Sequence, residues 1–258
     1  MLFFNYPCFV LLMFLSWMLG SQDLGNKINN PVKLFKNEAP VYTASRLKSP
    51  INIDGDWNKP QWQKTKAVKI KNMMGGKPEF IPSTEAKVSY DHENVYVIFR
   101  VKDRHVKCLD REYNGPVYQD SCVEFFFAPD TEQPLNYFNV EINCGGSILT
   151  HYVTTNGKDH LKLEVEDLKK IEIAHSQPEV VDPEIAEPTI WTIEYRIPLS
   201  MLEKYSKVTY PGPGVTWKAN FFKIAGKTSN PHYFTWSFID HPTPKFHLPE
   251  YFGTLKFK

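Results

Sequence analysis

One carboxylate in this sequence is set almost entirely among apolar neighbours. Glu124 lies in the stretch 119–130, where aromatic and β-branched residues favour a strand that Pro129 would end. Successive side chains of a strand point to opposite faces. One face would carry Val123, Phe125 and Phe127, and the other would carry Cys122, Glu124 and Phe126. An unpaired carboxylate is costly to bury, so Glu124 must reach water, a cation, hydrogen-bond donors or a polar ligand. Glu124 is therefore the first candidate for a functional role.

Further carboxylates on predicted strands could act together with this one. Two carboxyl groups about 5 to 10 Å apart in a cleft can hydrolyse a glycosidic bond. The four candidates for such a pair are Asp120, Glu124, Glu141 and Glu194. A glycoside hydrolase is thus an alternative, although strand carboxylates more often only meet solvent or hydrogen-bond donors. The GxSxG, HExxH, P-loop and strand-turn-helix GxGxxG motifs are missing from the sequence, so nucleophilic and nucleotide chemistry have no local support.

An acidic turn and the dispersed histidines could hold a metal ion. The sequence Asp54-Gly55-Asp56 is rich in oxygen ligands but lacks the EF-hand pattern, so an ordinary turn competes with a weak calcium site at Asp54 and Asp56. The last thirty residues contain His232, His241 and His247. A zinc site would require these side chains to converge in space.

A haem-binding sandwich domain for electron transfer is a second alternative. Met73 and Met74, with His92 or His105, could supply axial ligands to the iron. Neighbouring methionines in a glycine-rich loop more often simply cover apolar surface. A visible absorption spectrum would separate the two interpretations.

Short strands must position these residues, because alternating apolar segments and turns follow one another from residue 41 onward. The clearest hairpin pairs residues 84–90 with residues 95–102, and residues 137–143 alternate between an apolar and a polar face. Residues 197–202 form the one plausible short helix, while Trp57 and Trp62 are expected to close one end of the core. About ten strands with hardly any helix predict an all-β fold, an antiparallel β-sandwich of jelly-roll type.

The N-terminus carries an apolar segment ahead of this predicted domain. Residues 3–19 are almost wholly apolar and are followed by polar residues, which predicts a signal peptide or a retained N-terminal anchor over residues 1–22. Residues 23–40 form a polar lead-in, and residues 41–258 form the predicted domain. Export would place the protein outside the cell, in the periplasm or at the cell surface. Three cysteines would then remain, which leaves at least one free thiol or a pairing between chains.

The balance of charge argues against a nucleic-acid partner. The chain has 30 basic and 29 acidic residues, a formal charge of +1, and no dense basic run. A surface that neutralises phosphates needs a clear surplus of Lys and Arg. Apart from a retained leader, no membrane span is expected either.

Five motifs occur in an order that is typical of one known family. They are residues 53–57 (Ile-Asp-Gly-Asp-Trp), 95–103, 120–126, 191–198 with Leu202, and 249–255. Over residues 41–258 this series resembles the carbohydrate-binding module family 9 domain. The resemblance implies a β-sandwich, attached to xylanases or standing alone in exported proteins, in which two aromatic rings enclose a terminal sugar without cleaving it. Some members also hold structural calcium, which adds support to the calcium expectation.

The resemblance also implies which residues bind the sugar. The family's two tryptophans fall at Tyr118 and Phe246, its motif glutamate at Glu124, and an arginine at Asn139. The C–H faces of a pyranose pack on aromatic rings, and its hydroxyl groups need donors and acceptors around the edge. The rings of Tyr118 and Phe246 are smaller than that of tryptophan, which implies weaker stacking on the sugar. The carboxylate of Glu124 is kept, but the amide of Asn139 in place of the arginine implies weaker charged recognition of a reducing-end sugar. The competing interpretation is that Tyr118 and Phe246 only cap the core.

These observations predict an exported, non-catalytic β-sandwich that binds a polysaccharide or its oligosaccharide ends, in the service of polysaccharide recognition or degradation. No cofactor beyond a structural calcium ion is expected. The alternatives are a glycoside hydrolase, a haem-binding sandwich, and a scaffold or adhesion domain without a ligand.

Overall fold

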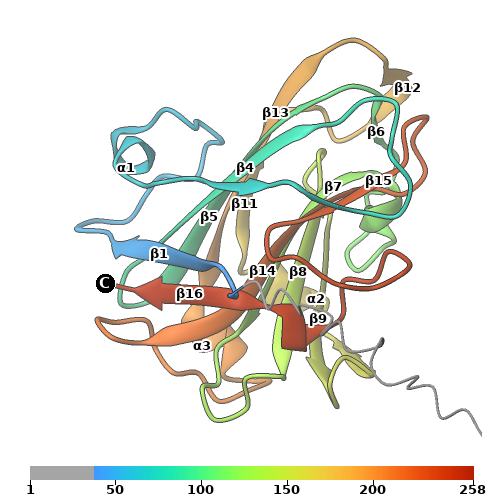
Figure 1. Ribbon diagram of the computed structural model, residues 1–258. Helices are drawn as coiled ribbons and strands as arrows, with labels where there is room; N and C mark the ends of the chain where they lie inside the picture. The colour runs from blue at the N-terminus through green and yellow to red at the C-terminus, as the bar shows by residue number, and fades with distance from the viewer. Residues whose placement is uncertain (1–37) are drawn as a thin grey trace, which may run out of the picture. The chain divides into compact units, whose positions relative to one another are not determined.

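The strand that carries Glu124, β7 (Ser121–Ala128), lies inside the first of two packed β-sheets (Figure 1). The computed structural model describes residues 38–258, so the predicted leader and most of the polar lead-in lie outside the described residues. The described part contains sixteen strands, three four-residue α-helices and two 3₁₀ turns. None of its helices has the length and apolar character needed to cross a membrane.

The first sheet follows the order β10-β9-β8-β7-β14-β16-β1. Beyond the end of β16, the C-terminal half of β14 pairs with β15, which in turn pairs with β3. The further strands of this sheet are β3 (Asn72–Met74), β8 (Tyr137–Asn143), β9 (Ile148–Thr154), β10 (Asp159–Lys162), β14 (Thr216–Ala225), β15 (His232–Thr235) and β16 (Gly253–Phe257).

The second sheet follows the order β1-β4-β5-β13-β11, with β2 paired to β4. Its strands are β1 (Val41–Arg46), β2 (Val68–Ile70), β4 (Ser83–Tyr90), β5 (Asn94–Asp103), β11 (Glu172–His175) and β13 (Thr189–Pro198). A separate ribbon pairs β6 (Val106–Cys108) with β12 (Val181–Ile185). The short helical turns are α1 (Pro60–Gln63), α2 (Val165–Leu168), α3 (Leu199–Leu202), η1 (Val117–Gln119) and η2 (Pro249–Tyr251).

Strand β1 belongs to both sheets and runs parallel to both of its neighbours. Residues 41–44 pair with β16 and residues 45–46 pair with β4, so the two ends of the domain lie side by side (Figure 1). The remaining strand pairs are antiparallel, as predicted for the sandwich. Hairpin turns fix the antiparallel direction of strands close in sequence, whereas no such turn links β1 to β16.

Most predicted strands lie within one or two residues of their observed bounds, because alternating apolar side chains and turn residues mark them locally. The predicted hairpin is the pair β4 and β5, and the predicted short helix is α3. Two further helical turns, α1 and α2, and several three- to five-residue strands go beyond the prediction. One of these strands, β12, lies inside residues 177–188, a segment rich in Pro and Glu.

The main core lies between the two sheets and is rich in aromatic side chains. Phe125 stacks on Phe127 and on Phe221, with ring centroids 4.8 Å apart in both pairs. Trp191 of the second sheet and Trp217 of the first are completely buried in the same cluster. The face of β7 that carries Val123, Phe125 and Phe127 therefore points into the main core.

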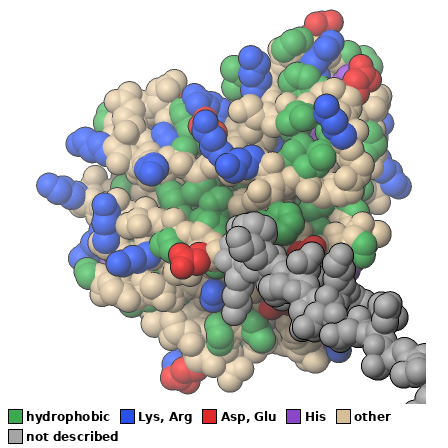
Figure 2. Space-filling model, in the orientation of Figure 1, with side chains coloured by type: hydrophobic (Ala, Val, Ile, Leu, Met, Phe, Trp, Pro, Cys, Tyr) green, Lys and Arg blue, Asp and Glu red, His purple; other side chains and the backbone are tan. Residues whose placement is uncertain are grey.

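Both outer faces are also covered, so the domain has three hydrophobic clusters. Trp57 and Trp62 were expected to close one end of the core, but they pack with Tyr96 and Ile98 in a separate cluster on the outside of the second sheet. On the outside of the first sheet, Phe126, Phe222, Phe246 and Phe252 belong to a second cluster. At the surface, Figure 2 shows basic, acidic and hydrophobic side chains intermixed.

The polar face of β8 is buried, because this second outer cluster lies over it. Phe138, Val140 and Ile142 point into the main core as the alternation predicts. Asn139 is completely buried on the opposite face, and Glu141 is almost completely buried there. The three cysteines of the described part, Cys108, Cys122 and Cys144, are likewise buried and form no disulfide.

Candidate functional site

A cavity of about 350 Å³ opens on the outer face of the first sheet, over the middle of β7. It brings together three of the four predicted sugar-binding residues, Tyr118, Glu124 and Phe246. The other lining residues are Glu141, Leu149, His151, Ile224, Tyr233, Pro244, Lys245 and His247. The cavity thus combines apolar walls with two carboxylates from adjacent strands.

Aromatic rings from three separate segments form the walls of this cavity. Phe246 comes from the loop before η2, and its ring stacks on the buried Phe222 with centroids 4.3 Å apart. Tyr233 meets Phe246 edge to face at 6.3 Å. Tyr118, on η1, keeps 42% of its surface exposed. Since Phe222 supports Phe246 from within, the ring of Phe246 is held rigidly beside the cavity.

Two carboxylates meet at the base of the cavity. Glu124 of β7 is directly opposite Glu141 of β8 in the antiparallel register. Their exposed fractions are only 2% and 4%. Directly opposed residues on antiparallel strands have Cβ atoms about 5 Å apart, so these side chains are near neighbours. Because both side chains project from strands of the sheet and are almost fully buried, they lie at the base of the cavity.

Burial and mutual repulsion keep protons on this pair. Burial raises the pKa of Glu124 well above its usual value, and the charge of Glu141 raises it further. Burial also raises the pKa of Glu141 to about 8, although a hydrogen bond from Asn139 opposes the change. A low-polarity environment disfavours the charged form of a carboxyl group, and a second carboxylate nearby adds to this effect. The pair can therefore both donate and accept hydrogen bonds near neutral pH.

Two histidines beside the carboxylates remain neutral. Burial lowers the pKa of His151 to about 4 and that of His247 to about 3. The hydroxyl group of Tyr137 lies 2.7 Å from Nδ1 of His247, and His160 packs edge to face on His247 at 4.6 Å. Neutral imidazoles offer one donor and one acceptor each. They add polar recognition to the cavity without adding positive charge.

Asn139 does not line the cavity, although it was predicted to contact the sugar. Its Nδ2 donates to Oε1 of Glu141 at 2.7 Å, and its Oδ1 accepts from the backbone N–H of His151. Asn139 therefore orients two lining residues from behind. Sequence reasoning did not assign the other eight lining residues to the sugar site, among them Glu141, His151, Tyr233 and His247. Glu141 had a signal, as a polar residue on an alternating strand, but its partner across the sheet was not predictable.

The other two carboxylates considered for hydrolysis have structural roles. Asp120 accepts hydrogen bonds from the backbone N–H groups of Leu109 and Asp110, at 3.1 and 2.9 Å, and from Nδ2 of Asn143 at 3.0 Å. Glu194 is completely buried and accepts from Nε1 of Trp62 at 2.7 Å, among other donors. Of the four candidates, only Glu124 and Glu141 line this cavity.

The acidic turn at residues 54–56 is organised by Glu194 and Lys59. Oε2 of Glu194 accepts from the backbone N–H groups of Asp54 and Gly55, at 2.9 and 2.7 Å. Nζ of Lys59 lies 2.7 Å from Oδ1 of Asp54, and Asp56 caps the backbone N–H of Asn58 at 2.8 Å. Residues 38–258 contain no group of three or more His, Cys, Asp or Glu side chains arranged to hold a metal ion.

The proposed haem ligands have other contacts. Met74 is buried in the second outer cluster. His105 has its Nδ1 3.1 Å from Glu184, and His92 lies beside Glu93 in the exposed turn between β4 and β5. These contacts are those of ordinary packing and surface ion pairs.

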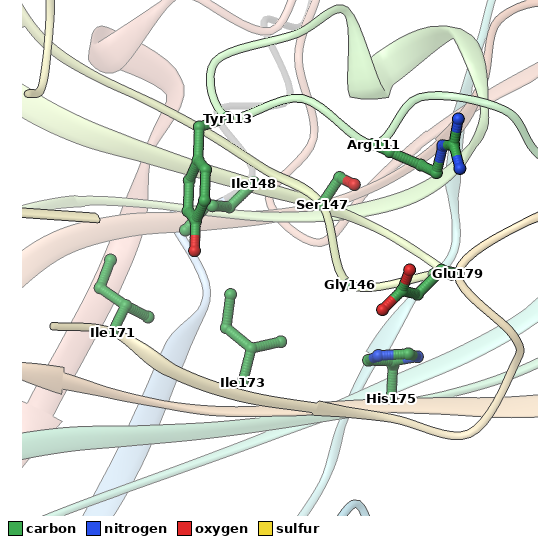
Figure 3. Close-up of a pocket in the computed structure, with 10 residues that line it drawn as sticks. Arg111, Tyr113, Gly146, Ser147, Ile148, Ile171, Ile173, His175 and Glu179 are labelled. Atoms are coloured by element: carbon green, nitrogen blue, oxygen red, sulfur yellow. The ribbon is translucent and has the colours of Figure 1, made fainter. Parts of the chain in front are cut away.

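A second cavity of about 350 Å³ lies beside the β8–β9 turn (Figure 3). Tyr113, Ile171 and Ile173 lie toward one end, and Arg111, His175 and Glu179 lie toward the other. A Cβ atom on Gly146 would come within 2.6 Å of the His175 ring, so this close approach requires glycine. Nδ1 of His175 is 2.7 Å from the carbonyl oxygen of Gln177, and Arg111 and Glu179 are exposed. Because its ionised groups are exposed to water, this cavity is a weaker candidate than the first.

Similar proteins share this fold. A protein from Bacteroides uniformis, proposed to bind carbohydrate, has a TM-score of 0.75 and 24% identity over 86% of this chain and 100% of its own. A carbohydrate-binding module of family 9 from Caldicellulosiruptor kristjanssonii, solved with cellotriose, has a TM-score of 0.57 and 16% identity over 85% of this chain and 94% of its own. The structure of a family 9 module from the same organism with glucose has the same TM-score and identity, over 85% of this chain and 96% of its own. Among curated proteins, none matches this chain significantly.

The sequence profile of carbohydrate-binding family 9 matches residues 56–257, which is most of the chain and nearly all of the described domain. The match includes β7, β8, β14 and the loop that carries Phe246. On this match, and with the two-sheet fold already described, the chain belongs to carbohydrate-binding family 9.

Proposed function

We propose that the cavity beside Glu124 binds a saccharide without cleaving it, and that Tyr118, Phe246 and Glu124 contact the sugar directly. One observation carries this proposal: two carboxylates that are almost fully buried face a cavity whose walls are aromatic. Aromatic rings pack on the C–H face of a pyranose, while carboxyl groups exchange hydrogen bonds with its hydroxyl groups. Asn139 positions Glu141 rather than the sugar.

Similar proteins support a glucose-type ligand. The two Caldicellulosiruptor structures of the same fold were solved with cellotriose and with glucose. Gluco-configured oligosaccharides are therefore the first neutral ligands to test. Family membership also supports a non-catalytic role in polysaccharide recognition.

Export and calcium stay predictions. We infer secretion, or display in the periplasm or at the cell surface, from the apolar segment at residues 3–19 and from a ligand that is found outside cells. Calcium at Asp54 and Asp56 is supported by two carboxylates in one turn and opposed by the ammonium group of Lys59. A melting temperature that falls with a chelator and recovers with calcium would support it, and an unchanged one would contradict it.

The central test is a calorimetric titration with cello-oligosaccharides. Tyr118→Ala and Phe246→Ala should each weaken binding about 30-fold, since truncating an aromatic anchor costs about 2 kcal/mol. Tyr113→Ala is a matched control, because Tyr113 lies at the second cavity and is 45% exposed, against 42% for Tyr118.

Phe246 also packs in the second outer cluster, so its variant will be less stable. Tyr118 is largely exposed, so Tyr118→Ala should lose binding at an unchanged melting temperature. If no saccharide in a broad glycan panel binds the parent protein, the proposal is wrong. Release of reducing ends from the same glycans would instead support the hydrolase alternative, with Glu124 and Glu141 as the pair.

A further inference from the structure

The two carboxylates of the cavity have almost no protein partners. Within residues 38–258, Glu124 forms no hydrogen bond and no ion pair, although it is 2% exposed and lines the cavity. Glu141 accepts one hydrogen bond, from Asn139 at 2.7 Å. A buried carboxylate normally accepts several hydrogen bonds or pairs with a cation. The unused acceptor oxygens of both groups therefore point to donors supplied by a ligand.

The nearby cations are occupied elsewhere. Lys223 follows Phe222 on β14 and is completely buried, so its side chain lies on the opposite face of the sheet from the cavity. Its Nζ donates to the carbonyl oxygen of Ile224 at 2.9 Å and lies 2.7 Å from Nε2 of His232 and 3.1 Å from Asp103. Lys223 is thus paired with Asp103 and forms no bond with either carboxylate, although its charge lowers the pKa of Glu124 and so partly offsets the effect of burial.

The remaining lining residues supply no positive charge at the base. Lys245 is exposed, and within the described domain it pairs with neither carboxylate. His151 and His247 are neutral near pH 7, as their buried surroundings require. Within residues 38–258, the base of the cavity therefore holds two carboxyl groups and no cation that pairs with them.

A cationic ligand can supply the missing partner. The two carboxyl groups keep their protons while the cavity is empty, but a positive charge beside them favours their ionised form, so they can release a proton when the ligand enters. A neutral hydroxyl group gives no such stabilisation. An ammonium group has three donors and could bond to both carboxylates at once. Hydrogen bonds between ionised groups are about twice as strong as those between neutral groups. The arrangement of charge therefore favours a cationic saccharide over a neutral one.

We propose that the preferred ligand of this cavity is an amino sugar with a free amino group, whose ammonium group bonds to Glu124 and Glu141 while the ring packs against Phe246. This inference rests on the proposed function and specifies the class of saccharide. A glucosamine unit keeps the equatorial hydroxyl groups and the C–H faces of glucose and adds one positive charge. Its N-acetyl derivative has lost that charge and carries additional bulk.

Three trisaccharides of matched linkage test the inference by calorimetry. They are the β-1,4-linked trimers of glucosamine, glucose and N-acetylglucosamine, at a pH where the amine of the first is protonated. The glucosamine trimer should bind at least about tenfold more tightly than the other two, as expected for one hydrogen bond between charged groups. This comparison needs no variant, so it remains decisive even if a substitution impairs folding.

Substitutions at the acidic pair then assign the preference to this site. Glu124→Gln and Glu141→Gln keep the shape of each side chain and remove its charge, so each should reduce the preference for glucosamine about tenfold. Glu93→Gln is the control for non-specific attraction, because Glu93 is 73% exposed in the turn between β4 and β5 and should leave the preference unchanged.

Two results would overturn the inference while leaving the proposed function intact. One is binding of the glucose trimer as tight as that of the glucosamine trimer. The other is a glucosamine preference that survives both substitutions or falls equally with Glu93→Gln. If none of the three trimers and no glycan of the wider panel binds, the proposed function fails as well.

Discussion

Glu124 and Glu141 face each other from adjacent strands, and their burial gives single residues an influence on the pH response of the whole domain. Glu141 is surrounded by Asn139 on its own strand, Glu124 from β7, His151 from β9 and His247 from the C-terminal loop. No cation pairs with it among residues 38–258. Its protonated form is therefore favoured in the folded state.

The sign of the pH effect follows from this preference. Burial raises the pKa of Glu141 from 4.5 to about 8, so the folded protein binds its proton more tightly than the unfolded chain. The free energy of unfolding should then decrease as the pH rises from about 4.5 to about 8, because the unfolded state binds fewer protons. Glu141→Gln should lack this contribution and become more stable relative to the parent across that window.

Urea unfolding of both proteins at several pH values measures this difference. The lowered pKa values of the buried His151 and His247 reduce the free energy of unfolding as the pH falls. Both proteins contain these histidines, so their contributions largely cancel when the two are compared. A difference in free energy of unfolding that does not change with pH would show that Glu141 is ionised throughout.

At the scale of elements, one buried acid fixes a long loop to a strand. Glu194 of β13 is completely buried and binds Nζ of Lys59 through both oxygens, at 2.8 and 2.6 Å. It also accepts from Trp62 and from the backbone of residues 54 and 55. This network attaches the segment between β1 and β2 to the outer face of the second sheet, where Trp57 and Trp62 cover Ile98.

Removing this acid should destabilise the domain strongly. Glu194→Ala removes the buried partner of Lys59, which keeps its contact with the more exposed Asp54, and leaves the buried Nε1 of Trp62 without its acceptor. We therefore expect a loss of about 3–5 kcal/mol in the free energy of unfolding. Glu172→Ala is a matched control on the adjacent strand β11, because its ion pair with Arg196 is partly exposed. That pair should contribute less than about 1 kcal/mol. Equal losses in denaturant unfolding of the two variants would contradict this role for Glu194.

At the scale of the whole molecule, β1 connects the two sheets through backbone pairing. It pairs with β16 of the first sheet and with β4 of the second. Its Tyr42 and Ala44 are buried in the main core, and the hydroxyl group of Tyr42 donates to the carbonyl of Lys66 at 2.8 Å. The same hydroxyl oxygen accepts from the backbone N–H of Val88 at 2.9 Å.

Truncation tests this connection. A chain that begins at residue 38 should show a single cooperative thermal transition, because it contains all the strands that the structure describes. A chain that begins at residue 47 should melt at a much lower temperature, since one edge each of β16 and β4 loses its partner and the core loses two buried side chains. Equal melting temperatures would mean that side-chain packing alone holds the sheets together.

Local sequence determined most of the strands and three residues of the candidate cavity. Alternation of apolar residues is a short-range signal, so the faces of β7 and β8 and the hairpin of β4 and β5 were predictable. Tyr118, Glu124 and Phe246 were selected through the resemblance to the family, by their positions relative to its motifs, and they line the same cavity. What they bind stays a prediction.

Tertiary structure alone decided the depth and the charge of that cavity. The opposition of Glu141 to Glu124 depends on the register between two strands, and the approach of His247 depends on a loop about one hundred residues away in sequence. The parallel pairing of β1 and the burial of the polar face of β8 also required the assembled fold. Register, loop closure and solvent exclusion arise from contacts between distant segments, and a pattern read over a few residues contains no information about them.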